Sequence, residues 1–214
     1  MQIKACHLLA KLNSDQVSAK LGELGTIQDI VSLLRFHIKK ESMLTAATAA
    51  LWTQCANEMN ASVATAEKAF KQILTIMEIY PKNVALLANC VSSVWSLCLE
   101  DDNEDMAIDQ ATPLIFTALK THPKETKCKK CTKKGTSYFC LVLQVSLMAL
   151  TAIASCGDAA CHRILSPDKK TNGLELLLKQ VEIHLNTREV CDEFALFVEE
   201  LLEEETIEGN FRYN

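Results

Sequence analysis

The sequence predicts an all-α fold in which similar groups of helices repeat along the chain. Three observations lead to this prediction: glycine and proline are scarce, apolar residues recur at helical spacing, and apolar segments echo one another about 42 residues apart. The 214 residues contain six glycines and four prolines, which is few for strands and tight turns. Apolar residues make up 49% of the chain and charged residues 23%, so an ordered core is expected.

The repeat is visible in two series of apolar segments. In the first, Trp52 and Cys55 are matched by Trp95 and Cys98 at an offset of 43 residues. The second series has steps of 42, 41 and 60 residues and comprises Val31, Ile73, Leu114 and Leu174. Because the long step contains a basic, cysteine-bearing stretch, we interpret that stretch as an insertion in an otherwise regular array.

Helical periodicity gives the expected elements. Ile27, Val31 and Leu34 fall on one helix face at spacings of three and four. Asn83 and Asn172 precede two apolar runs, where short amide side chains cap helix N-termini. The first ten residues are expected to form the first turns of an amphipathic helix. The other predicted helices span 27–38, 43–57, 63–79, 83–99, 106–121, 137–155, 172–185 and 188–204.

Several segments resemble armadillo repeats. The run from Lys20 to Leu34 is similar to the Gly-x-Ile-x-x-Leu-Val-x-Leu-Leu start of the family's second helix. The Ala-Leu signature of its third helix is resembled by Ala50-Leu51, Ala149-Leu150 and Ala195-Leu196. The resemblance covers the chain from about Asn13 onward. It implies one domain over residues 1–214, a right-handed α-solenoid of about four armadillo-like repeats whose third helices line a concave groove.

The resemblance also implies a non-enzymatic scaffold that binds a partner protein or peptide through that concave face. Its contact residues are expected at non-core positions of the third helices: Thr45, Thr48, Thr53, Asn89, Ser92, Ser96, Gln144 and Thr151. The start of the first helix is apolar, which predicts homodimerisation or contact with further repeats at this helix. We therefore also expect that the chain could be a piece of a longer array.

The two tryptophans do not match the ladder of the importin-like members of the family. At the three positions where those members carry Trp, this chain has Thr48, Val91 and Leu147, and at their Asn positions it has Thr53, Ser96 and Ala152. Trp52 and Trp95 are therefore expected to pack between successive repeats, and the alternative is a half-exposed aromatic anchor for a partner.

Residues 123–136 are predicted to form a mobile basic loop. Pro123 disfavours helical geometry in the residue before it, so the preceding helix should end there. The segment holds like charges and few apolar side chains, so it can bury little apolar area. That burial would not offset the conformational entropy lost when the segment becomes ordered. The loop's lysines are Lys124, Lys127, Lys129, Lys130, Lys133 and Lys134. They suggest an acidic partner or a phosphate, but aromatic residues that would stack on bases are missing until Tyr138, so nucleic acid is disfavoured.

Zinc is the one cofactor that the sequence suggests. Cys128 and Cys131 form a Cys-x-x-Cys pair, which can present two thiolates to one ion but needs two further ligands. The candidates are His122, Cys140, Cys156, Cys161 and His162. We favour ordinary thiols in a basic loop, with zinc and redox chemistry as the alternatives. A metal-stabilised module that contacts nucleic acid or an acidic partner through this insertion is accordingly the second function considered.

Other function classes find little support. Catalysis is disfavoured because the five histidines are scattered and no phosphate-binding or nucleophile motif occurs. No run of eighteen apolar residues predicts a membrane span. The ten cysteines lie mostly in apolar helical runs and no secretory signal precedes them, which indicates a reducing compartment, cytoplasmic or nuclear.

Overall fold

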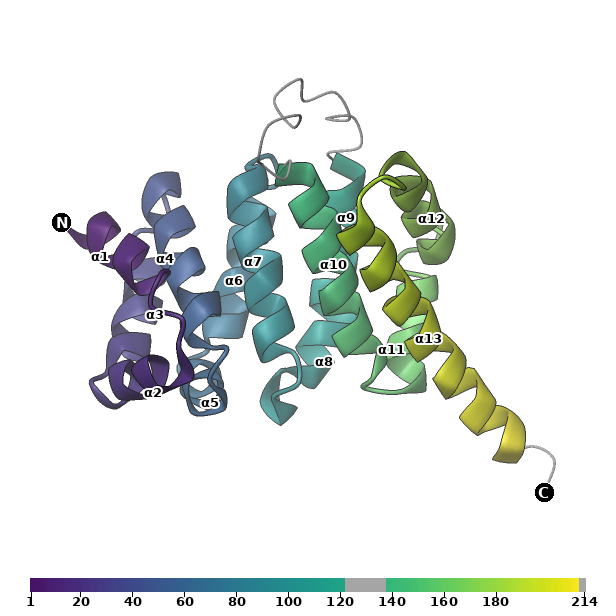
Figure 1. The fold of residues 1–214 in the computed structure, drawn as a ribbon, viewed down its shortest axis with the longest axis horizontal. Helices are drawn as coiled ribbons and strands as arrows, with labels where there is room; N and C mark the ends of the chain where they lie inside the picture. Colours follow the sequence, from purple (N-terminus) through teal and green to yellow (C-terminus); the bar gives the residue numbers. More distant parts are fainter. Residues whose placement is uncertain (122–137, 212–214) are drawn as a thin grey trace.

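A computed structural model describes residues 1–121 and 138–211, with side chains described over 1–121 and 140–203. Every regular element in these residues is a helix, which confirms the all-α prediction (Figure 1). The predicted basic loop at 123–136 lies outside the described residues. Asn83 and Asn172 do cap α7 and α12: their side chains accept from Leu86 N at 3.1 Å and from Glu175 N at 3.0 Å.

Successive elements are joined by short connections, except that residues 122–137 separate α9 from α10. The elements are α1 (Gln2–Leu9), α2 (Asp15–Glu23), α3 (Thr26–Phe36), α4 (Glu41–Gln54), α5 (Glu58–Ala66), α6 (Ala69–Ile79), α7 (Val84–Leu97), the 3-10 turn η1 (Asp101–Asn103), α8 (Glu104–Met106), the π-helical η2 (Ala107–Ala111), α9 (Thr112–Thr121), α10 (Tyr138–Ala154), α11 (Asp158–Leu165), α12 (Gly173–Ile183) and α13 (Arg188–Phe211).

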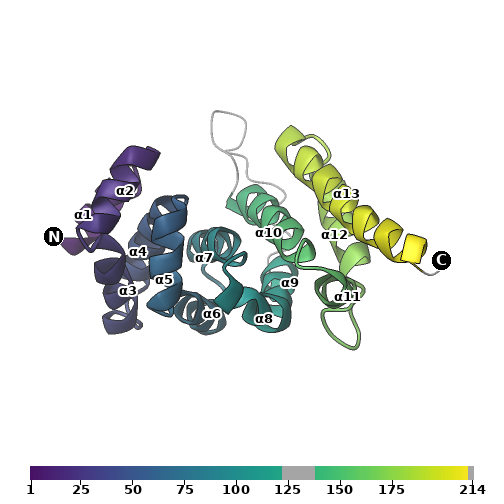
Figure 2. The same ribbon diagram turned by 90° about the horizontal axis from the view of Figure 1, so that it is seen from below.

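Helices α1, α4, α7, α10 and α13 form a row in which each packs on the next. Between α1 and α7, two helices separate each member of the row from its successor, and α11 and α12 do the same between α10 and α13. Figure 2 shows α3, α6 and α9 on the opposite side from α1 and α13, which stand forward at the two ends of the row. The row is thus one layer of the molecule, with a second layer behind it.

The 42-residue period corresponds to hydrogen bonds between equivalent places in successive groups. Tyr80 Oη donates to Ile38 O at 2.8 Å, and Asn83 Nδ2 donates to Glu41 Oε2 at 2.7 Å; each pair is 42 residues apart. The same separation joins Asn57 to Asp15, Asn60 to Ser18 and Gln54 to Leu12. The repeat in the sequence is therefore a physical register between neighbouring helices.

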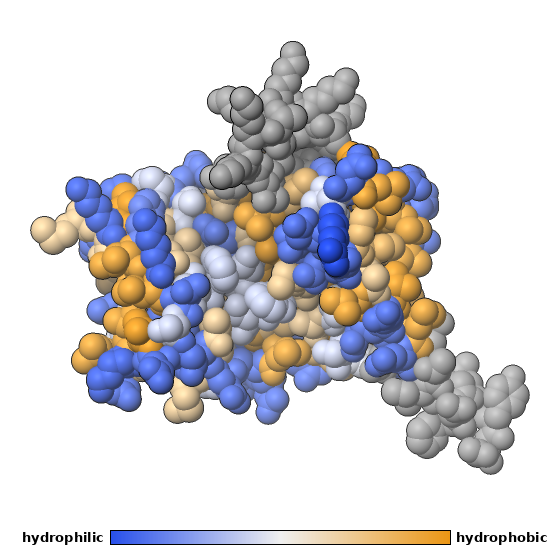
Figure 3. All heavy atoms as spheres, viewed as in Figure 1, coloured by the Kyte–Doolittle hydropathy of each residue, from blue (hydrophilic) through white to orange (hydrophobic). Residues whose placement is uncertain are grey.

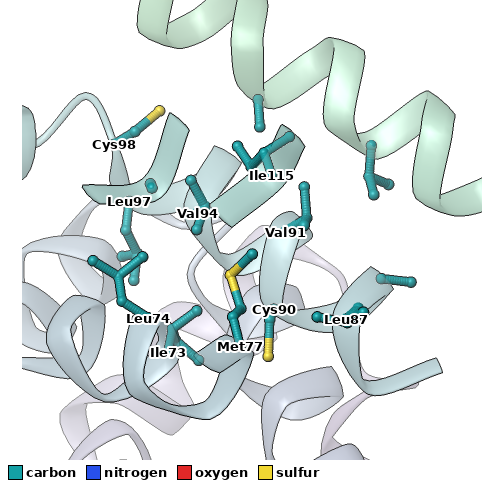
Figure 4. Close-up of a cluster of buried hydrophobic side chains, with 14 of the residues drawn as sticks. Ile73, Leu74, Met77, Leu87, Cys90, Val91, Val94, Leu97, Cys98 and Ile115 are labelled. Atoms are coloured by element: carbon teal, nitrogen blue, oxygen red, sulfur yellow. The ribbon is translucent and has the colours of Figure 1, made fainter. Parts of the chain in front are cut away.

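The core lies between the row and the layer behind it. Figure 4 shows buried side chains from α6, α7 and α9 meeting there, including Ile73, Met77, Val91 and Ile115. Cys90 sits in the same cluster with no exposed surface. Such thiols behave as small hydrophobes, as the sequence predicts.

Two predicted helices differ from the structure. The helix expected at 63–79 is divided into α5 and α6 because Lys68 adopts a left-handed conformation with φ of 62°. The helix expected at 106–121 begins with α8 and the wider turn η2, in which the Thr112 N–H bonds to Ala107 O. Pro113 follows, and its missing N–H and its ring disrupt the regular α-helical ladder just before it.

Candidate partner-binding face

Three adjacent helices of the row carry almost no charge. The 14 residues of α7 and the 17 residues of α10 include no Asp, Glu, Lys or Arg, and α4 has one charged residue, Glu41, at its N-terminus. Charged residues make up 23% of the chain as a whole. The charge is therefore carried by the rest of the molecule, and the accessible side of α4, α7 and α10 is left without it.

The accessible side chains of these helices are small polar groups with a few apolar ones. Trp95 is 39% exposed, and Leu99, one helical turn later, is 63% exposed. Figure 3 shows intermediate hydropathy at the centre of this side, between blue and orange areas toward its ends. We call it the uncharged face and define it by Thr45, Ala49, Trp52, Asn89, Trp95, Ser96, Leu99, Gln144, Met148 and Thr151.

The polar groups of the uncharged face are held in place by the helices themselves. Asn89 Nδ2 donates to Thr45 O at 3.0 Å and so links α7 to α4. The Ser96 hydroxyl donates to Ser92 O at 3.0 Å, and the Thr151 hydroxyl donates to Leu147 O at 2.9 Å. Each of these hydroxyl oxygens still has acceptor capacity toward solvent. The face can thus accept hydrogen bonds from a partner without rearranging.

Three of the eight predicted contact residues are wrong. Thr48 is fully buried, Thr53 is 4% exposed and Ser92 is 7% exposed. Their hydroxyls donate to carbonyls of their own helices, at 2.8, 2.9 and 3.0 Å respectively. They face neighbouring helices because α4 and α7 are enclosed on both sides by the row. Thr45, Asn89, Ser96, Gln144 and Thr151 are accessible, and their contact with a partner stays a prediction.

The two tryptophans differ in their exposure to solvent. Trp52 is half-buried, as expected of packing between repeats, but more than a third of Trp95 is open to solvent. The exposure of Trp95 agrees with the alternative reading of a half-exposed aromatic side chain.

The cysteine-rich candidates divide into two groups. His122, Cys128, Cys131 and all six loop lysines lie outside the described residues. Cys140 is described, and its Sγ lies 3.1 Å from Nδ1 of His184, a residue that the sequence did not single out. They are 44 residues apart, so no local motif joins them.

The remaining zinc candidates do not converge on one another. Cys156 Sγ donates to Ala152 O at 3.7 Å, and Cys161 Sγ donates to Ala154 O at 3.6 Å. Across residues 1–121 and 140–203, no three His, Cys, Asp or Glu side chains are grouped closely enough to hold a metal ion. His162 lines a shallow hollow with Asp105, Asp109 and Arg163 instead.

Four of the eight described thiols are buried core groups. Burial raises the pKa of Cys55 and of Cys98 to about 12, with a further contribution from the Glu100 carboxylate at Cys55. Complete burial also raises the pKa of Cys90 well above its usual range. These thiols stay protonated at neutral pH. They are therefore unreactive, because only the thiolate is nucleophilic.

The N-terminal end of the row exposes apolar side chains, as the sequence predicts. A groove of about 510 Å³ between α1 and α3 is lined by Leu8, Leu9, Ile30, Leu33 and Phe36, among others. Leu8 is 59% exposed and Phe36 is 84% exposed. Such a patch is typical of a contact surface.

Comparison with models of protein families, with curated proteins and with solved structures found no match to the chain. Within its described part, none of the helices combines the length and the apolar character needed to cross a bilayer.

Proposed function

We propose that the chain is an armadillo-type α-solenoid of about four units, which serves as a non-enzymatic scaffold. It binds a partner protein or peptide on the uncharged face. One observation carries the proposal: apart from Glu41 at the start of α4, three neighbouring helices in the row of a charged protein present only uncharged side chains to solvent. Depletion of charge around aromatic residues is what distinguishes the centre of a protein–protein interface from ordinary surface.

The order of packing supports the assignment of units. In an armadillo array the third helix of each unit packs on the third helix of the next. Helices α4, α7, α10 and α13 correspond to these third helices. Two helices precede each of α4, α7 and α13, and the short elements η1, α8 and η2 with α9 precede α10. The concave groove that the family resemblance implies then coincides with the row that carries the uncharged face.

The chemistry of the uncharged face favours a weakly polar partner. An extended basic peptide would find no carboxylate on α7 or α10, and a nucleic acid would find no lysine or arginine for its phosphates. Trp95 and Leu99 offer apolar area, and Asn89 and Ser96 offer hydrogen-bonding groups beside them. The best fit is a polypeptide segment that combines an apolar side chain with backbone amides.

The proposal is tested by introducing charge on the uncharged face. Ser96→Glu places a carboxylate on α7, the middle helix of the three, and Thr75→Glu on α6 is a matched control. Both residues are half-buried helix hydroxyls that donate to a carbonyl four residues earlier at 3.0 Å. Proteins captured by the full-length chain should be lost with Ser96→Glu and retained with Thr75→Glu. Equal capture by both variants would contradict the proposal.

The second function that the sequence suggests, a metal-stabilised contact through the basic insertion, rests on residues outside those described. It stays a prediction with a simple test. Zinc measured in protein purified without chelators, together with salt-dependent binding of DNA or RNA, would support it. Less than one zinc per chain with no such binding would remove it.

A further inference from the structure

Cys140 and His184 form a thiol–imidazole pair. Cys140 lies in the first turn of α10, and His184 ends α12. Their Sγ and Nδ1 atoms are 3.1 Å apart, within hydrogen-bond reach, and the Thr187 hydroxyl lies 3.9 Å from the same sulfur. His184 is 8% exposed, whereas Cys140 is half-buried and so open to small reagents.

The other half-buried cysteines of the described part lie against backbone carbonyls. Cys191, Cys161 and Cys156, which are also half-buried, donate to backbone carbonyls at 3.6, 3.6 and 3.7 Å. A carbonyl oxygen stabilises the protonated thiol and cannot accept its proton permanently, whereas an imidazole can. The pairing therefore distinguishes Cys140 chemically.

The surroundings of the pair favour a neutral imidazole beside the thiol. Burial lowers the pKa of His184, so at neutral pH its ring is a base able to take a proton. The first turn of a helix as long as α10 presents unpaired N–H groups and the positive end of the helix dipole, which stabilise negative charge on a nearby sulfur. A histidine partner and a helix N-terminus are both found beside reactive protein thiols.

We propose that Cys140 is a redox modification site at which a hydroperoxide converts the thiol to a sulfenic acid, with His184 as the acid–base partner. His184 Nδ1 takes the proton of the thiol, and the sulfur attacks one peroxide oxygen. The S–O bond forms as the O–O bond breaks, and the departing oxygen takes the proton back from the imidazolium. With hydrogen peroxide the products are Cys–SOH and water, so sulfur loses two electrons and the peroxide gains two.

The position of the pair gives the modification a structural consequence. Cys140 belongs to α10, while His184 and Thr187 belong to the connection between α12 and α13, and α10 packs directly on α13. An oxygen added to Sγ has to fit at this joint between two members of the row. Oxidation would therefore change the packing at the end of the uncharged face. The reactivity of Cys140 itself does not depend on what that face binds.

The test is site-resolved thiol labelling of the full chain at pH 7. Alkylation by iodoacetamide is followed by mass spectrometry of the separate cysteine peptides, so other thiols do not interfere. Cys140 should react at least about tenfold faster than Cys191 in the wild-type chain. His184→Asn keeps a hydrogen-bonding nitrogen near the Nδ1 position but is not a base, and should lower the Cys140 rate about tenfold. Asn186→Ala, at an exposed residue of the same turn, should leave it unchanged.

Hydrogen peroxide with dimedone then tests the oxidation itself. The sulfenic acid adduct should form at Cys140 in the wild-type chain and fall about tenfold in His184→Asn. Circular dichroism checks that the variants fold. If His184→Asn does not fold, the wild-type ratio of Cys140 to Cys191 decides alone. A wild-type ratio near one, or a folded His184→Asn that reacts as fast as wild type, would overturn the proposal.

Discussion

Asn60 and Asn103 hold equivalent places 43 residues apart in the chain, and each donates its side-chain amide to the carbonyl six residues earlier. The acceptors are Gln54 O at 3.0 Å and Leu97 O at 2.9 Å. Each amide also reaches the helix of the preceding group, at Ser18 O and at Thr65 Oγ1. Both asparagines are 2% exposed, so these hydrogen bonds connect successive groups of helices within the core.

Asn60→Ala should therefore destabilise the fold strongly. It leaves buried carbonyls without their donor and opens a small cavity, at a cost of about 2–3 kcal/mol. Asn57→Ala is the matched control. It removes a helix cap and a surface hydrogen bond to Asp15, and should cost about 1 kcal/mol. The urea midpoints of both variants measure the difference, and equal midpoints would contradict the role given to Asn60.

Gly173 should not tolerate a side chain. A Cβ at this position would overlap the carbonyl oxygen of Ile164 and would lie 2.9 Å from Cζ of Phe116. Because the first obstacle is backbone, Gly173→Ala has to push α12 away from α11, and we expect a loss of about 2 kcal/mol or more. Glu175→Ala, an exposed change in the same helical turn, should lower stability far less. Thermal unfolding of the two variants compares them.

Asp168 should make stability depend on pH. Hydrogen bonds from Lys120, Thr171 and the backbone N–H of Lys170, at 2.9, 2.7 and 2.8 Å, hold the pKa of its carboxyl well below the usual range. A lowered folded-state pKa stabilises the fold above the unfolded value, near pH 4, and this stabilisation is lost as pH falls further. The site is on the surface, so the effect should be small and weakened by salt.

Asp168→Asn removes the titration. Its melting temperature should lie below that of the wild type at pH 6, and the gap should close toward pH 2. A gap that stays constant across this range would show that the carboxylate has another role.

The groove between α1 and α3 is expected to support self-association. Phe36 exposes 84% of its surface beside Leu8 and Leu33, and covering this area would remove apolar surface from water. Sedimentation of the wild-type chain should show a monomer–dimer equilibrium, which Phe36→Glu shifts to monomer. Leu178→Glu, at a 43% exposed leucine on α12, should not shift it. A wild-type chain that remains monomeric at all concentrations would end this expectation.

The sequence was sufficient for features that depend on neighbouring residues. The scarcity of glycine and proline, the helical spacing around Val31 and the caps at Asn83 and Asn172 all act within a few residues, and the structure confirms the helices they predict. The 42-residue echo was also readable, because the same contacts recur in each group.

Features that depend on packing between distant segments could not be read. Lys68 interrupts a continuous apolar pattern without glycine or proline to mark the break. In α4 and α7 nearly all residues are apolar or small, so periodicity could not separate the buried Thr48 and Ser92 from the accessible Thr45. Cys140 meets His184 only because α10 lies beside the end of α12, which no local signal reveals.

The binding affinity of a captured partner tests the central claim most directly. Trp95→Ala removes the exposed aromatic side chain that α7 contributes to the uncharged face, and Leu178→Ala removes a similarly exposed apolar side chain from α12. Titration calorimetry with the partner should give a Kd at least about tenfold weaker for Trp95→Ala, as for other aromatic anchors, and unchanged for Leu178→Ala. An unchanged Kd for Trp95→Ala, or an equal loss in both variants, would contradict binding through the uncharged face.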